Sequence, residues 1–217
     1  MNSLPDKLED CTIHGNGSEL LIVEGDSASR AIKRVRFHQW QAILPMQGKP
    51  MNATKASLVA IKDNIEFAAL LASLGIELGD DLDLNQIRYE RIVLLFDPDA
   101  DGIHGRTLML LFFYHCLRPL LDAGRIFDTH APLWAVSAAD LDHPLYAFSD
   151  DHLKRIRQAL AEQGAVPLDT RRFRGLGNVD GIALRGLCLD PKSRRLQQLT
   201  ADDAENAIAL FAKMRAQ

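Results

Sequence analysis

The stretch IVLLFDPDADG, residues 92–102, joins a short apolar run directly to three alternating aspartates. A continuous apolar run of this length is typical of a strand that is buried on both faces of a parallel sheet. A second such run, LLIV at residues 20–23, is followed at once by the acidic turn EGDS, residues 24–27. Two buried strands that each end in acidic residues indicate a parallel sheet with polar groups at one edge, where such sheets bind ligands.

Helix-like and strand-like segments alternate along the chain on either side of these runs. Because of this alternation we predict an α/β fold, with a doubly wound, mostly parallel sheet flanked by helices. From about residue 138 the pattern changes to that of a small α+β carboxy-terminal subdomain. The predicted segments are a helix over 28–37 capped by Ser27, a strand over 41–44 ended by Pro45, a helix over 63–74, a strand over 91–96, a helix over 103–121, a strand from Ile126, and helices over 150–163 and 201–214.

Composition and charge exclude several classes of protein. Apolar residues make up 47% and charged residues 25% of the 217 residues, which are ordinary globular values and exclude disorder. The longest apolar stretch, residues 108–114, is far shorter than the about 20 residues of a membrane-spanning helix. A net charge of −4 excludes a simple basic DNA-coating protein. With three cysteines, no CxxC pair and no signal-peptide pattern in the first ten residues, we expect a cytoplasmic protein without a membrane partner.

The three aspartates of DPDADG are candidate metal ligands. If the extended geometry of the strand persists through Pro98, then Asp97, Asp99 and Asp101 point the same way, because residues two apart share a face. Three like charges on one face repel one another unless a cation lies among them, and hard oxygen ligands suit Mg²⁺, with Mn²⁺ as the alternative ion. Glu24 ends a neighbouring strand and would complete a set of four carboxylates. The pattern therefore indicates one or two metal ions that also bind phosphate.

Each acidic motif also has a simpler interpretation. Aspartates favour solvated loops after strands, and EGDS is a common way to begin a helix. The opening DxDxDG resembles a calcium-binding EF-hand loop, but Leu108 stands at the twelfth position, where that loop requires glutamate. His104 could approach a phosphate or act as a surface cap, and Lys49 could contact a phosphate as a point charge. None of the three tyrosines stands out as a nucleophile, because each is interpreted as a packing residue.

Taken together, the motifs resemble the carboxy-terminal half of the B subunit of type IIA topoisomerases, the family of DNA gyrase and bacterial topoisomerase IV, which contains the Toprim domain. A glutamate with DxD alone would indicate only a Toprim protein, whereas the GK…N loop, DGxH and RGLG point to type IIA enzymes. The matching stretches are LPDKLEDC (4–11), LLIVEGDSA (20–28), QAILPMQGKPMN (41–52), DPDADGIHGRTLMLLFFY (97–114), RPLLDAGRI (118–126), FRGLG (173–177) and LDPKSRRL (189–196).

The resemblance implies a Toprim, Rossmann-like fold. It divides the chain into a lead-in segment (1–18), a Toprim domain (19–137) and a carboxy-terminal subdomain of the topoisomerase B-subunit type (138–217). The sequence departs from the family where EGDSAGGSA becomes EGDSASRAI, where LRGKILN becomes MQGKPMN and where AQPPLY becomes THAPLW. We also expect the ATPase region and the basic tail of the family to be absent.

By the same resemblance, Glu24, Asp97 and Asp99 are the expected catalytic residues. They are also the expected main Mg²⁺ ligands, with Asp101 in support. The expected DNA contacts are Lys49, Asn52, His104 and Arg174.

The implied function is Mg²⁺-dependent cleavage and religation of duplex DNA on the chromosome. An A-type subunit would supply the catalytic tyrosine, and a separate ATPase subunit is a further expected partner. Two alternatives stay open at this point: a stand-alone Toprim protein that binds DNA or a topoisomerase subunit without cutting, and a Mg²⁺-dependent nuclease.

Overall fold

The computed structural model describes residues 3–79, 82–139, 141–165 and 167–215. Its strands are β1 (Gly15–Glu24), β2 (Gln41–Met46), β3 (Tyr89–Leu95), β4 (Ile126–Thr129), β5 (Trp134–Ala138), β6 (Leu145–Ala147), β7 (Pro167–Arg172) and β8 (Leu196–Gln198). Its helices are α1 (Gly25–Lys33), α2 (Leu58–Lys62), α3 (Ile65–Leu74), α4 (Ala100–Cys116), α5 (Arg118–Asp122), α6 (Asp150–Glu162), α7 (Gly181–Leu184) and α8 (Ala201–Arg215), with a 3₁₀ turn η1 (Leu176–Asn178) and a π-helical turn η2 (Arg185–Leu189).

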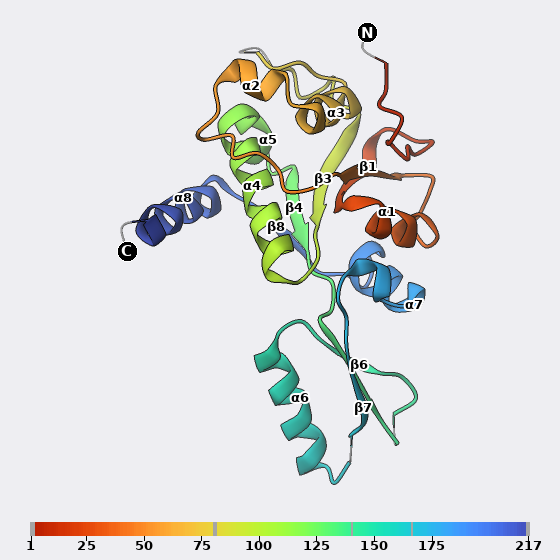
Figure 1. Ribbon diagram of the computed structural model, residues 1–217. Helices are drawn as coiled ribbons and strands as arrows, with labels where there is room; N and C mark the ends of the chain where they lie inside the picture. The colour runs from red at the N-terminus through yellow and green to blue at the C-terminus, as the bar shows by residue number, and fades with distance from the viewer. Residues whose placement is uncertain (1–2, 80–81, 140, 166, 216–217) are drawn as a thin grey trace.

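A five-stranded sheet forms the centre of the molecule, and its strand order is β2–β1–β3–β4–β8 (Figure 1). The strands β1 to β4 run parallel, and β8 pairs antiparallel with β4. A separate antiparallel sheet has the order β6–β5–β7 and is covered by α6. The predicted α/β fold with a mostly parallel sheet and flanking helices is therefore confirmed.

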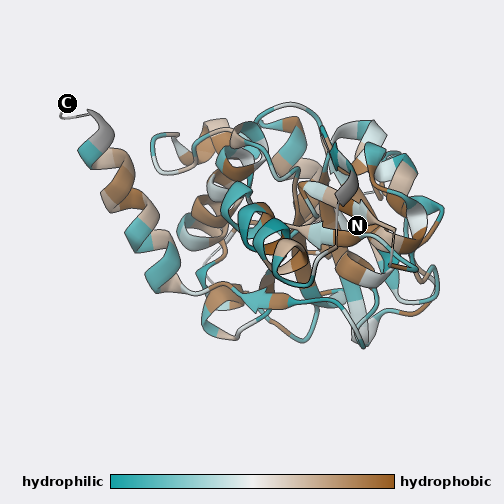
Figure 2. Ribbon diagram, turned by 90° about the horizontal axis from the view of Figure 1, so that it is seen from below, coloured by the Kyte–Doolittle hydropathy of each residue, from teal (hydrophilic) through white to brown (hydrophobic). Residues whose placement is uncertain are grey.

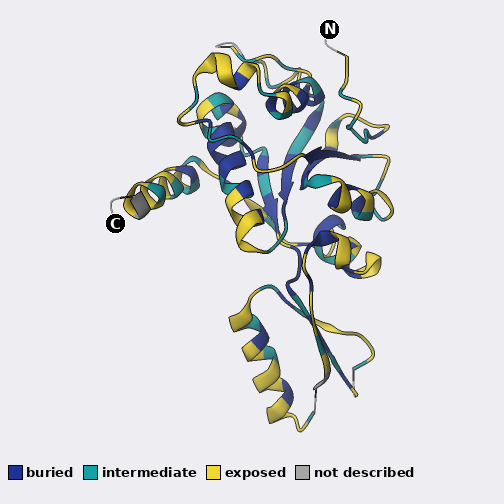
Figure 3. Ribbon diagram, in the orientation of Figure 1, coloured by how far each residue is buried: buried dark blue, intermediate teal, exposed yellow. Residues whose placement is uncertain are grey.

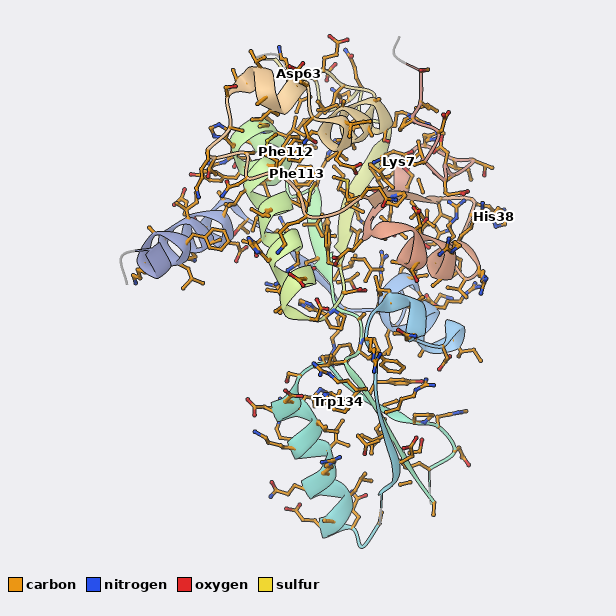
Figure 4. The ribbon with its side chains drawn as sticks, in the orientation of Figure 1. Lys7, His38, Asp63, Phe112, Phe113 and Trp134 are labelled. Carbon is orange, nitrogen blue, oxygen red and sulfur yellow. The ribbon has the colours of Figure 1, made fainter. Side chains whose placement is uncertain are left out.

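Helices cover both faces of the central sheet, and alternate residues of β1 show how. Leu20 and Ile22 face the core formed with α3, α4 and α5, which includes Phe112 and Phe113 (Figure 4). Leu21 and Val23 face the opposite core, formed with α1, α7 and η2. All four β1 side chains are fully buried, as the dark strands of Figure 3 show, so the unbroken LLIV run reflects burial on both faces.

Three of the differences between the observed and the predicted elements have a clear local cause. Ser27 does not cap the first helix, because Gly25 adopts φ +71 and turns β1 directly into α1, which leaves Ser27 inside the helix. Pro45 does not end its strand: β2 lies at the sheet edge, where the missing N–H of a proline is tolerated. The helix predicted over 103–121 is two helices, because the backbone leaves the helical region at Leu117, just before Pro119.

The predicted lead-in segment contributes to the sheet. Glu9 pairs with Ile43 at the outer edge of β2, Cys11 is buried, and β1 already begins at Gly15. These contacts hold residues 9–15 against β2 and β3, while the division into domains stays a prediction.

The last third of the chain does not remain apart from the central sheet. After β7 the chain returns, packs α7 and η2 against α1, and adds β8 to the edge of the central sheet. Helix α8 then packs on α4 and α5 through Ala204, Ala207 and Phe211, while its carboxy-terminal end points away from the body of the molecule (Figures 1 and 2). Among the described residues, no helix has both the length and the apolarity to cross a membrane.

Candidate metal centre

Glu24 and Asp97 meet at the carboxyl edge of the central sheet. Glu24 is the last residue of β1, Asp97 follows β3 by two residues, and β1 and β3 are parallel neighbours. The negative charges of Asp97, Asp99 and Asp101 all act on the Glu24 carboxyl group. The four carboxylates singled out in the sequence therefore gather at one place in the fold.

Asp99 and Asp101 do not lie on one strand face with Asp97, and that prediction is wrong. Asp99 is the N-cap of α4, and its Oδ1 accepts a hydrogen bond of 2.8 Å from the N–H of Gly102. This cap begins the helix at Ala100, so Asp101 lies in the first helical turn, where its side chain is 77% exposed. Glu24 and Asp97 are thus the inner pair of the site, and the other two aspartates form its outer rim.

The inner pair is held in an environment that disfavours negative charge. Burial raises the pKa of Glu24, and the charges of the three aspartates raise it further, while the backbone amide of Asp97 acts in the opposite direction. Burial also raises the pKa of Asp97, with a smaller contribution from Asp99 and an opposing one from the N–H of Leu176. Two carboxyl groups with raised pKa values side by side are a common feature of functional sites.

One oxygen of this pair has no partner. Oε2 of Glu24 is buried and accepts no hydrogen bond from the described residues. A buried carboxylate oxygen without a hydrogen-bond partner, next to a second carboxylate, destabilises the fold unless a cation is bound. Oxygen ligands of this kind fit a hard divalent ion. No three of the four carboxylates have oxygens within 4.8 Å of one another in the described part of the chain. They therefore fit an ion that keeps positions open for water or phosphate, not an ion enclosed by protein.

The glycine-rich loop FRGLG closes against this pair, and its glycines are needed for the close approach. Leu176 donates its N–H to Oδ1 of Asp97 at 2.8 Å. A Cβ on Gly175 would lie 2.5 Å from Oδ2 of Asp97, and a Cβ on Gly177 would lie 2.5 Å from Oγ of Ser27. Since these contacts leave no room for a side chain, the loop fixes the orientation of Asp97 from a segment far away in the sequence.

The four predicted DNA-contact residues have different surroundings. Lys49 forms an ion pair of 3.0 Å with Asp101 and so lies at the rim of the acidic site. Asn52 accepts hydrogen bonds from the backbone and hydroxyl of Thr54, which close its loop. Arg174 is exposed and immediately precedes the glycine that contacts Asp97. The fourth residue, His104, is also exposed, but its ring packs edge-on against Phe211 of α8 at 5.7 Å.

A second group of potential metal ligands lies elsewhere. One ligand atom from each of Asp10, Cys11 and His14 falls within a 4.8 Å cluster. However, Asp10 already accepts hydrogen bonds from the Tyr89 hydroxyl and the Cys11 amide and pairs with Arg88. Although burial opposes it, these bonds and that from His14 hold the pKa of Asp10 at about 2. Because the Arg88 guanidinium also lies 2.8 Å from Nε2 of His14, this cluster is a structural network already supplied with a cation.

Sequence reasoning missed three residues beside Asp97. A cavity of about 170 Å³ is lined by Asp97 together with Arg106, Asp128 and His130. Asp128 is 1% exposed, pairs with Arg106, and lies 3.3 Å from Nε2 of His130. Burial raises the pKa of Asp128, while His130 and Arg106 lower it. The only signal in the sequence was the charged residue within the strand IFDT, which helical or strand periodicity could not connect with Asp97.

Comparison with known proteins gives a consistent result. Residues 19–130 match the family model described as Toprim domain. The chain is 37% identical over 210 residues to the DNA gyrase B subunit of Thermotoga maritima, which covers 96% of this chain and 32% of that protein. It is 39% identical over 211 residues to the DNA gyrase B subunit of Mycoplasma pneumoniae (97% and 32%). It is 40% identical over 217 residues to the novobiocin-sensitive DNA gyrase B subunit of Streptomyces niveus (97% and 31%).

The similarity extends over nearly all of the chain but over only part of those proteins. The chain spans about a third of the length of these curated relatives. The matched part is a Toprim-containing portion of the gyrase B subunit, as the motifs of the sequence indicated.

Proposed function

Because this chain belongs to the Toprim family, we propose that it is the Mg²⁺-binding module of a type IIA DNA topoisomerase, which cleaves and religates duplex DNA with an A-type subunit. The observation that carries the proposal is the orphaned Oε2 of Glu24 beside Asp97 at the carboxyl edge of the sheet. The similarity of nearly the whole chain to gyrase B subunits supports it. The module would work at the chromosome in the cytoplasm.

The mechanism assigns a role to each acidic residue. Bound Mg²⁺, with Mn²⁺ as the alternative ion, would supply charge stabilisation for the scissile phosphate and the leaving 3′ oxygen. Glu24 and Asp97 would hold the ion, Asp99 would contribute from the N-cap of α4, and Asp101 would support the site from the rim. Because the pKa of Glu24 is raised, its carboxyl group is suited to give a proton to the leaving oxygen and to take it back during religation.

The chain itself offers no tyrosine suited to attack DNA. Tyr89 is fully buried and donates its hydroxyl to Asp10. Tyr114 and Tyr146 donate their hydroxyl groups to Glu205 and to an aspartate of the α7 cap. None of these hydroxyl groups is directed at the four carboxylates, which supports the proposal that the nucleophile comes from a partner protein.

Reconstitution tests the proposal. The chain is combined with a type IIA A-type subunit, labelled supercoiled DNA and Mg²⁺, and the products are denatured and treated with protease. We expect breaks whose 5′ ends carry the A-type subunit, and no breaks when the chain is omitted. DNA cleavage by the chain alone would instead identify a nuclease. Binding without cleavage in the complete mixture would identify a non-catalytic module, an alternative favoured by the engagement of Lys49 with Asp101.

Metal binding is expected to stabilise the fold through the inner pair. In the Glu24→Gln/Asp97→Asn double variant the repulsion is removed, and the asparagine keeps an acceptor for the N–H of Leu176. We therefore expect the metal-free variant to melt at the same or a higher temperature than the wild type, and Mg²⁺ to raise only the wild-type melting temperature. Thermal melts with and without Mg²⁺ measure this.

The matched control for the metal is Asp26→Asn. Asp26 is an exposed acid two residues from Glu24, but it bonds to Gln47 and does not act on the Glu24 carboxyl group. Its variant should keep the full response to Mg²⁺. An equal response in the double variant and the wild type would refute the site.

DNA binding is expected to be weak, salt-sensitive and dependent on Lys49. Phosphate contacts depend on local charge, so the net charge of −4 does not prevent them. Lys49→Ala should weaken binding to all sequences and flatten the salt dependence by about one unit of log–log slope. Fluorescence anisotropy titrations at several salt concentrations, with Lys62→Ala in α2 as control, measure this. If the Lys49→Ala variant has the wild-type DNA affinity and the wild-type salt dependence, Lys49 does not contact DNA.

A further inference from the structure

A cavity of about 610 Å³ lies beside the acidic site and has a different chemical character. Five segments from the second half of the chain meet around this cavity: the β4–β5 connection, β6, the first turns of α6, η2 and the loop before β8. Its lining residues are His130, Tyr146, Phe148, Ser149, His152, Arg155, Leu187, Ser193 and Arg195.

The wall of this cavity is cationic. Arg155 and Arg195 are exposed, and neither forms an ion pair among the described residues. Asp151, one turn earlier on α6, pairs with Lys154 instead, at 2.9 Å. In the described part of the chain, no carboxylate lines the cavity. The Ser193 hydroxyl already donates to the carbonyl of Gly186, whereas that of Ser149 only accepts a hydrogen bond, from the N–H of His152. Two guanidinium groups without internal ion pairs, together with the Ser149 hydroxyl, are donors suited to an anion with several oxygens, such as a phosphate.

The floor of the cavity is aromatic. The rings of Phe148 and His152 are stacked, with centroids 6.0 Å apart and planes 14° apart, and Tyr146 lies beside them. Two acids contact residues that line the cavity: Asp128 lies 3.3 Å from Nε2 of His130, and Asp180 accepts the Tyr146 hydroxyl at 3.2 Å. Phe148 is only partly buried and lines the cavity, so part of its ring is available to pack against a planar ring.

We propose that this cavity is a nucleotide-binding subsite, in which Arg155 and Arg195 bind the phosphate and the base packs on Phe148. The volume lies within the range of small-ligand sites, which is about 300 to 1,000 Å³. His130 and Phe148 also line the cavity that contains Asp97, so the two cavities adjoin. A nucleotide here is either free or part of a nucleic acid strand that continues from the acidic site. The inference goes beyond the proposed function, because it holds whether or not the chain takes part in DNA cleavage.

Isothermal titration calorimetry with deoxyadenosine monophosphate tests the subsite. We expect the wild-type chain to bind it, and the Arg155→Ala/Arg195→Ala double variant to bind at least about tenfold more weakly, because two charge-assisted contacts are lost. Both side chains are exposed, so the variant should fold, which circular dichroism and a thermal melt verify. Arg157→Ala is the matched control: it removes the same charge from an exposed position of α6 that does not line the cavity, and it should bind as the wild type does.

Two further ligands test the role of the base. Inorganic phosphate and deoxyadenosine should each bind more weakly than the complete nucleotide. The Phe148→Leu substitution should lower the affinity for the nucleotide but leave the affinity for phosphate unchanged. If a single-stranded hexanucleotide binds more tightly than the mononucleotide and is displaced by it, the subsite binds a nucleotide within a nucleic acid strand. Tighter binding of the mononucleotide would mean that the ligand is a free nucleotide. Equal affinity of the double variant and the wild type for the nucleotide would overturn the proposal, and so would phosphate that binds as tightly as the nucleotide.

Discussion

A Glu24→Gln chain reconstituted with an A-type subunit is expected to lose DNA cleavage by about 10²- to 10⁴-fold, the range for removal of a positioned acid–base group. Glutamine keeps the size of the side chain, but it cannot carry the proton or the charge that holds the ion. Oε2 of Glu24 also accepts no hydrogen bond from the described residues, so the substitution removes the oxygen on which the proposed metal site rests.

Single-turnover cleavage with labelled duplex DNA measures the rate of the Glu24→Gln mixture. Asp26→Asn serves as the control once more, since it removes a nearby acid that is not directed at Glu24, and it should cleave at close to the wild-type rate. DNA affinity, measured in parallel by anisotropy, should change far less than the rate. Cleavage by Glu24→Gln at more than a tenth of the wild-type rate would contradict both the metal and the proton-transfer role of Glu24.

An Arg194→Ala variant is expected to lose about 3 kcal/mol of folding free energy or more, because it breaks a buried ion pair. Arg194 and Glu19 are each 1% exposed, and Nη1 of Arg194 lies 2.7 Å from Oε2 of Glu19. Gln41 also donates to Glu19 at 3.0 Å, and Arg91 lies 3.5 Å away with a half-exposed side chain. Without Arg194, the buried Glu19 carboxylate in the middle of β1 keeps only these weaker partners.

Chemical denaturation with urea measures the loss of stability in Arg194→Ala. Arg195→Ala, which removes the exposed neighbouring arginine, should change stability by no more than about 0.5 kcal/mol. In the Glu19→Gln/Arg194→Met double variant no buried charge is left unpaired. Its loss of folding free energy should therefore be smaller than the sum of the losses in the Glu19→Gln and Arg194→Met single variants. Additive losses would mean that the two side chains do not depend on each other.

Local patterns predicted much of the fold. The unbroken apolar runs of β1 and β3 predicted strands buried on both faces. The helix predicted over 63–74 is α3, which ends, as predicted, at residue 74, before the left-handed Gly75. The predicted ends of an element were wrong where a neighbouring element determined how far it continues. β2 passes through Pro45 because it is an edge strand, a fact about strand order that no local pattern contains.

The sequence by itself determined that Glu24 and Asp97 each follow a buried strand, and parallel strands end at the same edge of a sheet. The strand order, which makes β1 and β3 neighbours and so brings the two carboxylates together, was decided by the tertiary structure. Only the tertiary structure decided that Leu176, 79 residues from Asp97, donates to its carboxylate. It also decided that Arg194 pairs with Glu19 across 175 positions of sequence. The physical reason is that strand and helix patterns reflect burial over a few residues, whereas pairing between distant segments depends on how whole elements pack.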